Sequence, residues 1–169
     1  MLKFLFRGLT AEPGGAALFG ALSAEARQPH WYVEGQVPDT LDGRFAMLAT
    51  VIALTLVRLE RDGEAANTVS VALTERFIEV MESEHRELGL GDPGLGRTVR
   101  KLVGMLANRT GLWRAASARE RDWSDTTREC LYKGEVSQIA LDHSAAALKK
   151  LADRLASTPL AAIEQGNIS

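Results

Sequence analysis

The sequence lacks the residue patterns that non-helical folds require. It contains one cysteine, Cys130, so no disulfide can form within the chain, which suits a reducing compartment. Alternation of polar and β-branched residues at period two is absent, which argues against β-strands. The formal net charge is −2, so no excess of basic residues points to nucleic acid. What remains is a chain of 169 residues, 46% apolar, with enough apolar residues for one buried core.

Long apolar runs of the kind that cross a membrane are also absent. Residues 45–57, FAMLATVIALTLV, carry no charge and lie between Arg44 and Arg58, but a spanning helix needs roughly 20 apolar residues. The run therefore predicts a buried central helix. The N-terminal MLKFLFRGL is interrupted by Lys3 and Arg7 and does not suit a secretory signal, which predicts a cytoplasmic protein. For this segment, contact with a membrane surface, packing on the domain and fraying stay open as alternatives.

Local motifs for catalysis and metal binding are missing. His30, His85 and His143 are far apart, and none lies three or four residues from a cysteine or another histidine, so a metal site is expected only if folding gathers them. Cys130 has no histidine nearby and is expected to be a small buried hydrophobic residue. Neither G-x-S-x-G nor H-E-x-x-H occurs. We therefore predict a protein that is not an enzyme and needs no cofactor.

Residues 89–96, GLGDPGLG, contain the spacing G-x-G-x-x-G without the context of a dinucleotide site. A helical pattern precedes them where a strand is required, Asp92 places negative charge where phosphate would lie, and Pro93 removes an N–H group. The same residues suit a boundary between two helices. Gly89 can end the first helix, Asp92 can cap the second, and Pro93 fits its first turn.

The spacing of apolar residues at three and four predicts an all-α fold, a single-domain bundle of about six to seven helices around a long buried central helix. We expect an N-terminal segment at residues 1–13, a helical domain at 14–157 and a C-terminal tail at 158–169. Residues 29–38 are expected to be extended, and Asp39 or Thr40 is expected to cap the central helix. The expected helices are residues 16–28, 40–61, 65–88, 93–108, 112–121, 125–132 and 136–156.

Some polar and aromatic residues exceed what a plain helical bundle needs. Trp31 and Tyr32 lie together in the expected connection, and Arg44 stands at the start of the apolar helix. Further along, the residues Arg97, Arg100 and Lys101 form a basic stripe opposite the apolar side of their helix. The stripe is either a solvated face or a docking surface for an acidic or membrane-proximal partner.

Two segments resemble the ubiquinol-cytochrome c chaperone family, the assembly factors of the cytochrome bc1 complex in mitochondria and alphaproteobacteria. The family's V-P-D-T-x-x-G-R-F segment is matched by VPDTLDGRF at residues 37–45. Its L-R-E-x-G-V-G-D segment is matched by HRELGLGD at residues 85–92, which departs from it at His85 and Leu90. The resemblance covers roughly residues 20–135. Near its end, LANRT at residues 106–110 matches the family at Arg109 and departs at Asn108.

The resemblance implies a helical chaperone that binds newly made cytochrome b and assists assembly of the bc1 complex, in the cytoplasm or peripherally on the inner membrane. It implies neither a cofactor nor nucleic acid. A helical interaction module of another pathway, and an enzyme whose site is assembled from distant residues, stay open as alternatives. The residues expected to bind the partner are Trp31, Tyr32, Pro38, Asp39, Thr40, Gly43, Arg44, Phe45, Arg86, Gly89, Gly91, Asp92, Arg97, Arg100 and Lys101. For Arg44 and Asp92 the alternative is an internal ion pair between two helix starts.

Overall fold

The chain folds into one all-α domain, as the apolar spacing predicts. The computed structural model describes residues 15–87 and 92–169, except for the side chains of His85 and of residues 92–95. The described residues contain no β-strand. Their helices are α1 (Ala16–Ala26), α2 (Pro29–Tyr32), α3 (Leu41–Glu60), the 3-10 turn η1 (Gly63–Ala66), α4 (Asn67–Glu87), α5 (Asp92–Ser117), α6 (Trp123–Leu131), α7 (Gln138–Ser157) and α8 (Leu160–Glu164).

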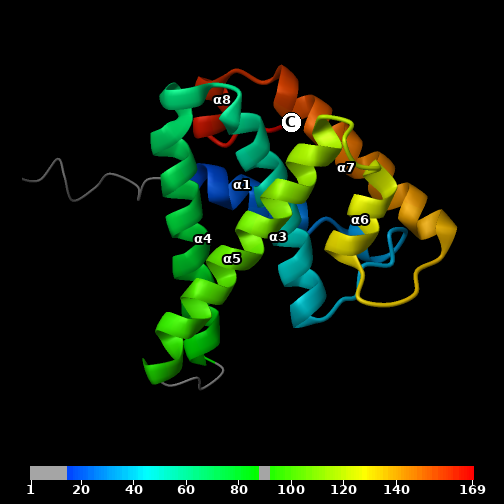
Figure 1. Cartoon of the computed structure of the whole chain (residues 1–169), viewed down its shortest axis with the longest axis horizontal. Coiled ribbons are helices and arrows are strands. Elements are labelled where there is room, and N and C mark those ends of the chain that lie inside the picture. Colours follow the sequence, from blue (N-terminus) through cyan, green and yellow to red (C-terminus); the bar gives the residue numbers. More distant parts are fainter. Residues whose placement is uncertain (1–14, 88–91) are drawn as a thin grey trace, which may run out of the picture.

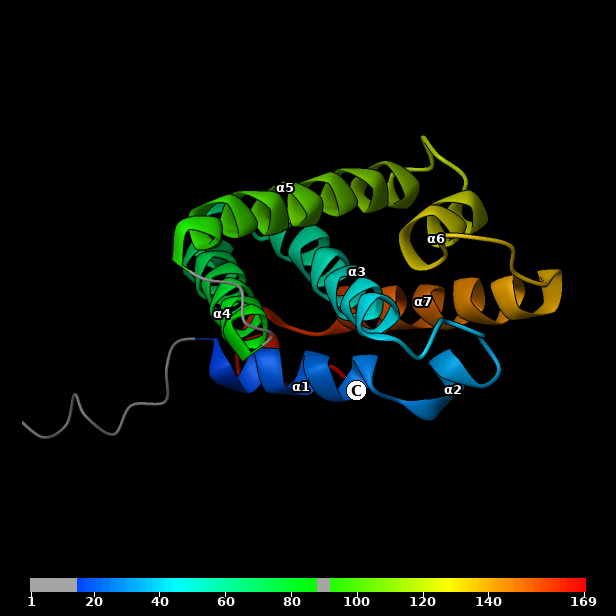
Figure 2. The ribbon, with the colours of Figure 1, turned by 90° about the horizontal axis from the view of Figure 1, so that it is seen from below.

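Helix α3 lies at the centre of the domain and is surrounded by its neighbours. It contacts α1, α4, α5, α6 and α7, and the two orthogonal views show these helices around it (Figures 1 and 2). Every residue from 49 to 55 is buried, because a helix that is apolar on all sides has no polar face to expose to solvent. The prediction of a buried central helix from the uncharged run is confirmed.

Hydrogen bonds from side chains fix where the main helices begin. The Thr40 hydroxyl accepts from the Gly43 N–H at 3.1 Å, so Thr40 rather than Asp39 caps α3. The Asp122 carboxylate accepts from the Asp125 N–H at 2.9 Å, and Ser137 starts α7 in the same way. Each cap satisfies an N–H group that the first helical turn leaves without an acceptor.

Two predicted boundaries are wrong. Residues 29–32 form the short helix α2 where an extended connection is expected, because the Trp31 indole N–H donates to the Glu25 carbonyl at 2.9 Å and the fully buried ring holds this turn against the core. Residues 92–117 form one helix where the sequence predicts two. Thr110 and Trp113 are buried on the same side as Leu106, so packing carries α5 through a segment of weak helix propensity.

The segment expected to be a C-terminal tail is packed against the first helix. Residues 160–164 form α8, which contacts α1, and Ile163 and Ile168 are 0% and 7% exposed. A β-carbon on Gly166 would lie 2.7 Å from the Ala17 carbonyl oxygen, so the backbones approach closely there. Arg58 adds hydrogen bonds to the carbonyls of Leu155 and Thr158, each at 2.8 Å. The C-terminal residues therefore contribute to the core.

Over residues 15–87 and 92–169, every helix falls short of the length and apolarity that crossing a bilayer requires.

We expect Ile163→Ala to lower the free energy of unfolding by about 3 kcal/mol, because it removes buried methyl groups and leaves a cavity under α1. The same substitution at Ile139, whose exposure is 84%, should change it by less than about 0.5 kcal/mol. Urea denaturation of both variants measures the difference. Equal small effects would mean that α8 does not contribute to the stability of the core.

Candidate functional site

Of the two segments that carry the family resemblance, the first runs into the amino end of α3, which borders a hollow, whereas residues 88–91 of the second lie outside the described residues. A hollow of about 140 Å³ lies where α3, α4 and the first half of α5 converge. The amino end of α3 and the stretch that follows the second motif therefore share one surface. Its lining residues are Leu41, Asp42, Phe45, Met81, Glu84, Thr98, Lys101, Leu102 and Met105.

A second hollow of about 160 Å³ adjoins the first and extends it toward α1 and α2. The two hollows share the lining residues Leu41, Phe45, Met81 and Glu84, and we call them together the entry groove. Its remaining residues are Ser23, Ala26, Arg27, Tyr32, Arg44 and Leu48. Leu41 is 57% exposed, so the groove presents an apolar side chain to solvent between charged ones.

The first motif is largely an architectural device. A β-carbon on Gly43 would lie 1.8 Å from the Pro38 carbonyl oxygen, so the tight entry into α3 tolerates only glycine at that position. Thr40 closes the same turn by capping Gly43. Leu41 and Phe45, one on each side of this glycine, are thereby fixed in the groove.

Arg44 pairs with Asp39 in the turn that precedes α3. Its Nε donates to Oδ1 of Asp39 at 2.7 Å, and both side chains are more than half exposed. This hydrogen bond lowers the pKa of Asp39. The alternative pairing of Arg44 with Asp92 involves a side chain that lies outside the described residues. Gly89 and Gly91 also lie outside them.

The other predicted binding residues divide between core and surface. Trp31 is fully buried, so its ring belongs to the core. Tyr32 lines the groove while its hydroxyl donates to the Ala26 carbonyl at 2.7 Å. Pro38 and Arg86 are exposed, and in the basic stripe Arg97, Arg100 and Lys101 are all exposed but only Lys101 lines the groove.

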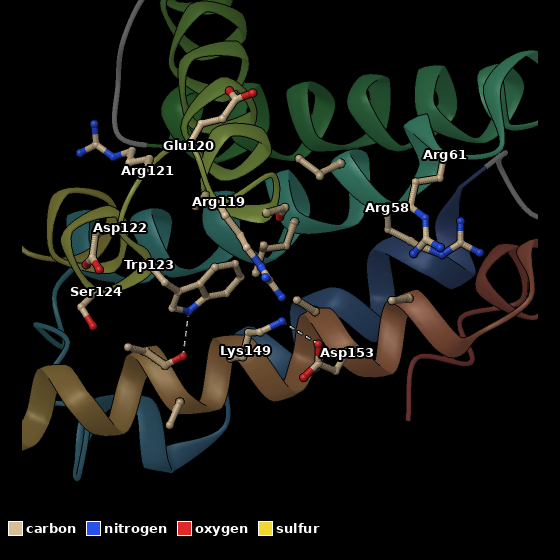
Figure 3. A pocket seen from close by; sticks show the side chains of 18 of the residues that line it. Arg58, Arg61, Arg119, Glu120, Arg121, Asp122, Trp123, Ser124, Lys149 and Asp153 are labelled. Carbon is tan, nitrogen blue, oxygen red and sulfur yellow. Dashed lines mark hydrogen bonds and ion pairs between the residues drawn. The ribbon is translucent and has the colours of Figure 1, made fainter.

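A larger hollow lies elsewhere, in a groove of about 1130 Å³ between α3, α7 and the α5–α6 connection. In Figure 3 Arg119 reaches toward Lys149 and Asp153, whereas Glu120 points away. Lys149 forms an ion pair with Asp153 at 2.8 Å, and its Nζ lies 5.5 Å from the centre of the Trp123 ring. Arg58 forms an ion pair with Asp62 at 2.6 Å. Five cationic and four acidic side chains line this groove, so the groove does not favour a ligand of either charge. We do not place the site there, because size alone does not define a binding chemistry.

Folding brings two distant histidines together, which no local pattern indicates. His30 Nδ1 lies 3.1 Å from His143 Nε2, and burial, followed by the effect of His143, lowers the pKa of His30. The described residues contain no group of three potential metal ligands. Cys130 is 2% exposed, and burial raises the pKa of its thiol to about 11. It is the small buried hydrophobic residue expected from the sequence, and it does not offer a reactive thiolate.

A helical scaffold with a part-apolar groove and a charged rim defines a protein that binds another protein. The chain belongs to the ubiquinol-cytochrome C chaperone family, which matches residues 33–169. It is also similar to the Cbp3 homolog from Brucella abortus, with a sequence identity of 29%. The match to the crystal structure of that protein covers 100% of this chain and 96% of that chain, with a TM-score of 0.78. No curated protein matches it significantly. Membership of this family supports a non-enzymatic role as an assembly chaperone of the bc1 complex.

Replacing Gly43 with alanine should lower the free energy of unfolding by about 2 kcal/mol, because the new methyl group overlaps the Pro38 carbonyl and the entry turn must open. Gly104→Ala is the matched control, since no atom lies within 4 Å of a β-carbon there, and alanine in a helix should stabilise by about 0.5–1 kcal/mol. Chemical denaturation measures both. A neutral Gly43→Ala would show that the turn is not constrained.

The histidine pair predicts a loss of stability in acid. The folded-state pKa of His30 lies below its unfolded value, so the unfolded chain takes up the proton first. The stability that neutral His30 contributes is present above the unfolded pKa and is lost as the pH falls toward the folded one. The free energy of unfolding should therefore decrease more steeply between pH 7.5 and 5 in the wild type than in His30→Gln. Parallel curves from urea denaturation across this range would contradict the prediction.

Proposed function

We propose that this protein is an assembly chaperone that binds newly made cytochrome b and assists biogenesis of the ubiquinol-cytochrome c reductase complex. Family membership supports the pathway, and the entry groove is the observation that carries the proposal for binding. The groove is lined by residues of the first segment by which the sequence resembles the family, and by residues of α4 and α5 that precede and follow the second segment. These residues together present a surface of mixed apolar and charged side chains.

The lining of the groove suits apolar side chains of an unassembled membrane protein. Phe45 provides an aromatic wall whose ring lies 5.9 Å from that of Phe77. Met81 and Met105 lie on the walls contributed by α4 and α5, and unbranched thioether chains adapt to ligands of different shape. Hollows of this size receive one or two anchoring side chains each, which is how an amphipathic helix is held in a groove.

Charges around the groove can orient the client. Lys101 lines the α5 side, while Asp42 on the α3 side is bonded to Lys133 at 2.7 Å. Arg97 and Arg100 continue the exposed basic stripe of α5. Exposed charges of this kind contribute to encounter rate and register more than to affinity. They suit a protein that works at the cytoplasmic face of the inner membrane as a peripheral component.

Substituting Leu41 with aspartate should reduce capture of cytochrome b about tenfold or more, because a charge replaces the apolar side chain shared by both hollows. Ile139→Asp is the matched control, since Ile139 is also exposed in the first turn of a helix but lines neither hollow. An acidic residue is favourable in a first turn, so both variants should stay folded. The measurement is a tagged pull-down from detergent-solubilised membranes, with bound proteins quantified by mass spectrometry.

Equal capture by both variants would remove the entry groove from the binding surface. Capture of other proteins by the wild type, with no cytochrome b among them, would favour the interaction module of another pathway.

A further inference from the structure

Arg109 is a partly buried arginine whose charge is not neutralised within the described residues. Its Nη2 donates to the Cys130 carbonyl at 3.3 Å, which is its one hydrogen bond among the described residues. Its Nε is buried without an acceptor. None of the described carboxylates, which do not include that of Asp92, forms an ion pair with it. Burial lowers the pKa of the guanidinium, as desolvation of an uncompensated cation requires.

The other half-buried arginines among the described residues each have a carboxylate partner, although the Nε of Arg76 is also buried without an acceptor. Arg58, whose side chain is 10% exposed, bonds Asp62 and two main-chain carbonyls through its three nitrogens. Arg121 bonds Thr126 and Glu129. A buried charge normally persists in a fold only when such partners surround it. Arg109 is the exception among these three arginines. Its unpaired charge destabilises the fold, and a functional role would explain why this destabilisation is tolerated.

The position of Arg109 places it beside the entry groove. It follows Met105 by one turn of α5 and Lys101 by two, and both of those residues line the groove. Its guanidinium carbon lies 5.9 Å from the centre of the Phe45 ring, which forms the groove wall. The residue is neither fully buried nor fully exposed. Nη1 has no acceptor among the described residues and is not sealed from solvent.

The two acidic side chains that line the groove, Asp42 and Glu84, do not fill this role. Asp42, the acid of the first motif that lines the groove, is bonded to Lys133, and this contact, followed by Lys101 at longer range, lowers its pKa. Glu84 lies on the α4 wall and forms no ion pair with Arg109. The open donors of Arg109 are thus available to an acceptor that arrives from outside.

We propose that Arg109 anchors a carboxylate of the bound partner, an aspartate or glutamate side chain or a chain terminus that enters beside Phe45. The inference rests on the proposed function of the entry groove. A carboxylate bonded end-on by Nη1 and Nη2 supplies the missing countercharge in the planar, two-bond geometry that favours arginine over lysine. The partner's adjacent apolar side chain then contacts Phe45 and Met105. Binding therefore removes the charge imbalance that folding leaves in place.

The test uses the full-length protein and combines a stability measurement with a binding measurement. Arg109→Met removes the charge while keeping a long side chain that can cover Phe45, and Arg109→Lys keeps the charge without the fork. We expect Arg109→Met to have an unchanged or higher urea midpoint and to capture cytochrome b at least tenfold less than the wild type. Arg109→Lys should fall between them. A merely structural arginine would show the opposite stability change.

Arg58→Met is the matched control, because Arg58 has its internal partners. It should lower the urea midpoint, and the fraction that stays folded should capture the client as the wild type does. Full capture by Arg109→Met, or a lowered midpoint in that variant, would overturn the role of Arg109. If Leu41→Asp abolishes capture while Arg109→Met does not, only this inference fails. If the wild type captures no cytochrome b, the proposed function fails, and the inference that rests on it fails with it.

Discussion

The burial of α3 on all sides is the constraint on which the rest of the structure depends. An uncharged helix without a solvent face must be covered along its whole middle section, and five helices supply that cover. Charged residues lie at both of its ends: Glu60 and Arg61 are exposed at the carboxyl end, and Asp42 and Arg44 are exposed beside Leu41 at the amino end. Burial of the middle therefore decides where a partner can reach this helix. The groove exists because α4 and α5 flank the amino end without covering it.

Local signals predict the parts of the fold that depend on neighbouring residues. The uncharged run predicts α3, and the threonine immediately before that helix predicts the cap at Thr40. Whether α5 continues past Asn108 depends instead on Trp113, which is buried against elements from distant parts of the sequence. The same holds for α8, because the burial of Ile163 depends on α1 at the opposite end of the chain. Contacts of this kind leave no local pattern to read.

The sequence predicts one wall of the candidate site but not its contacts. The motif residues Pro38, Thr40 and Gly43 shape the backbone, while Leu41 and Phe45 between and beside them contribute to the surface. Met81 and Met105 belong to no motif, since a helical spacing explains them equally well as core or surface, and Arg109 lies in a segment that matches the family only in part. The meeting of His30 and His143 is likewise a product of topology. The first motif locates part of the surface, and packing decides which residues of other helices join it.

The closure of α1 by the last residues of the chain has a consequence for synthesis on the ribosome. Helix α8 packs against α1, and residues 160–168 leave the exit tunnel well after that helix. Until then, the side of α1 that α8 covers is exposed, while α3, α4 and α5 can already associate. During synthesis the protein thus passes through a stage in which it exposes apolar surface.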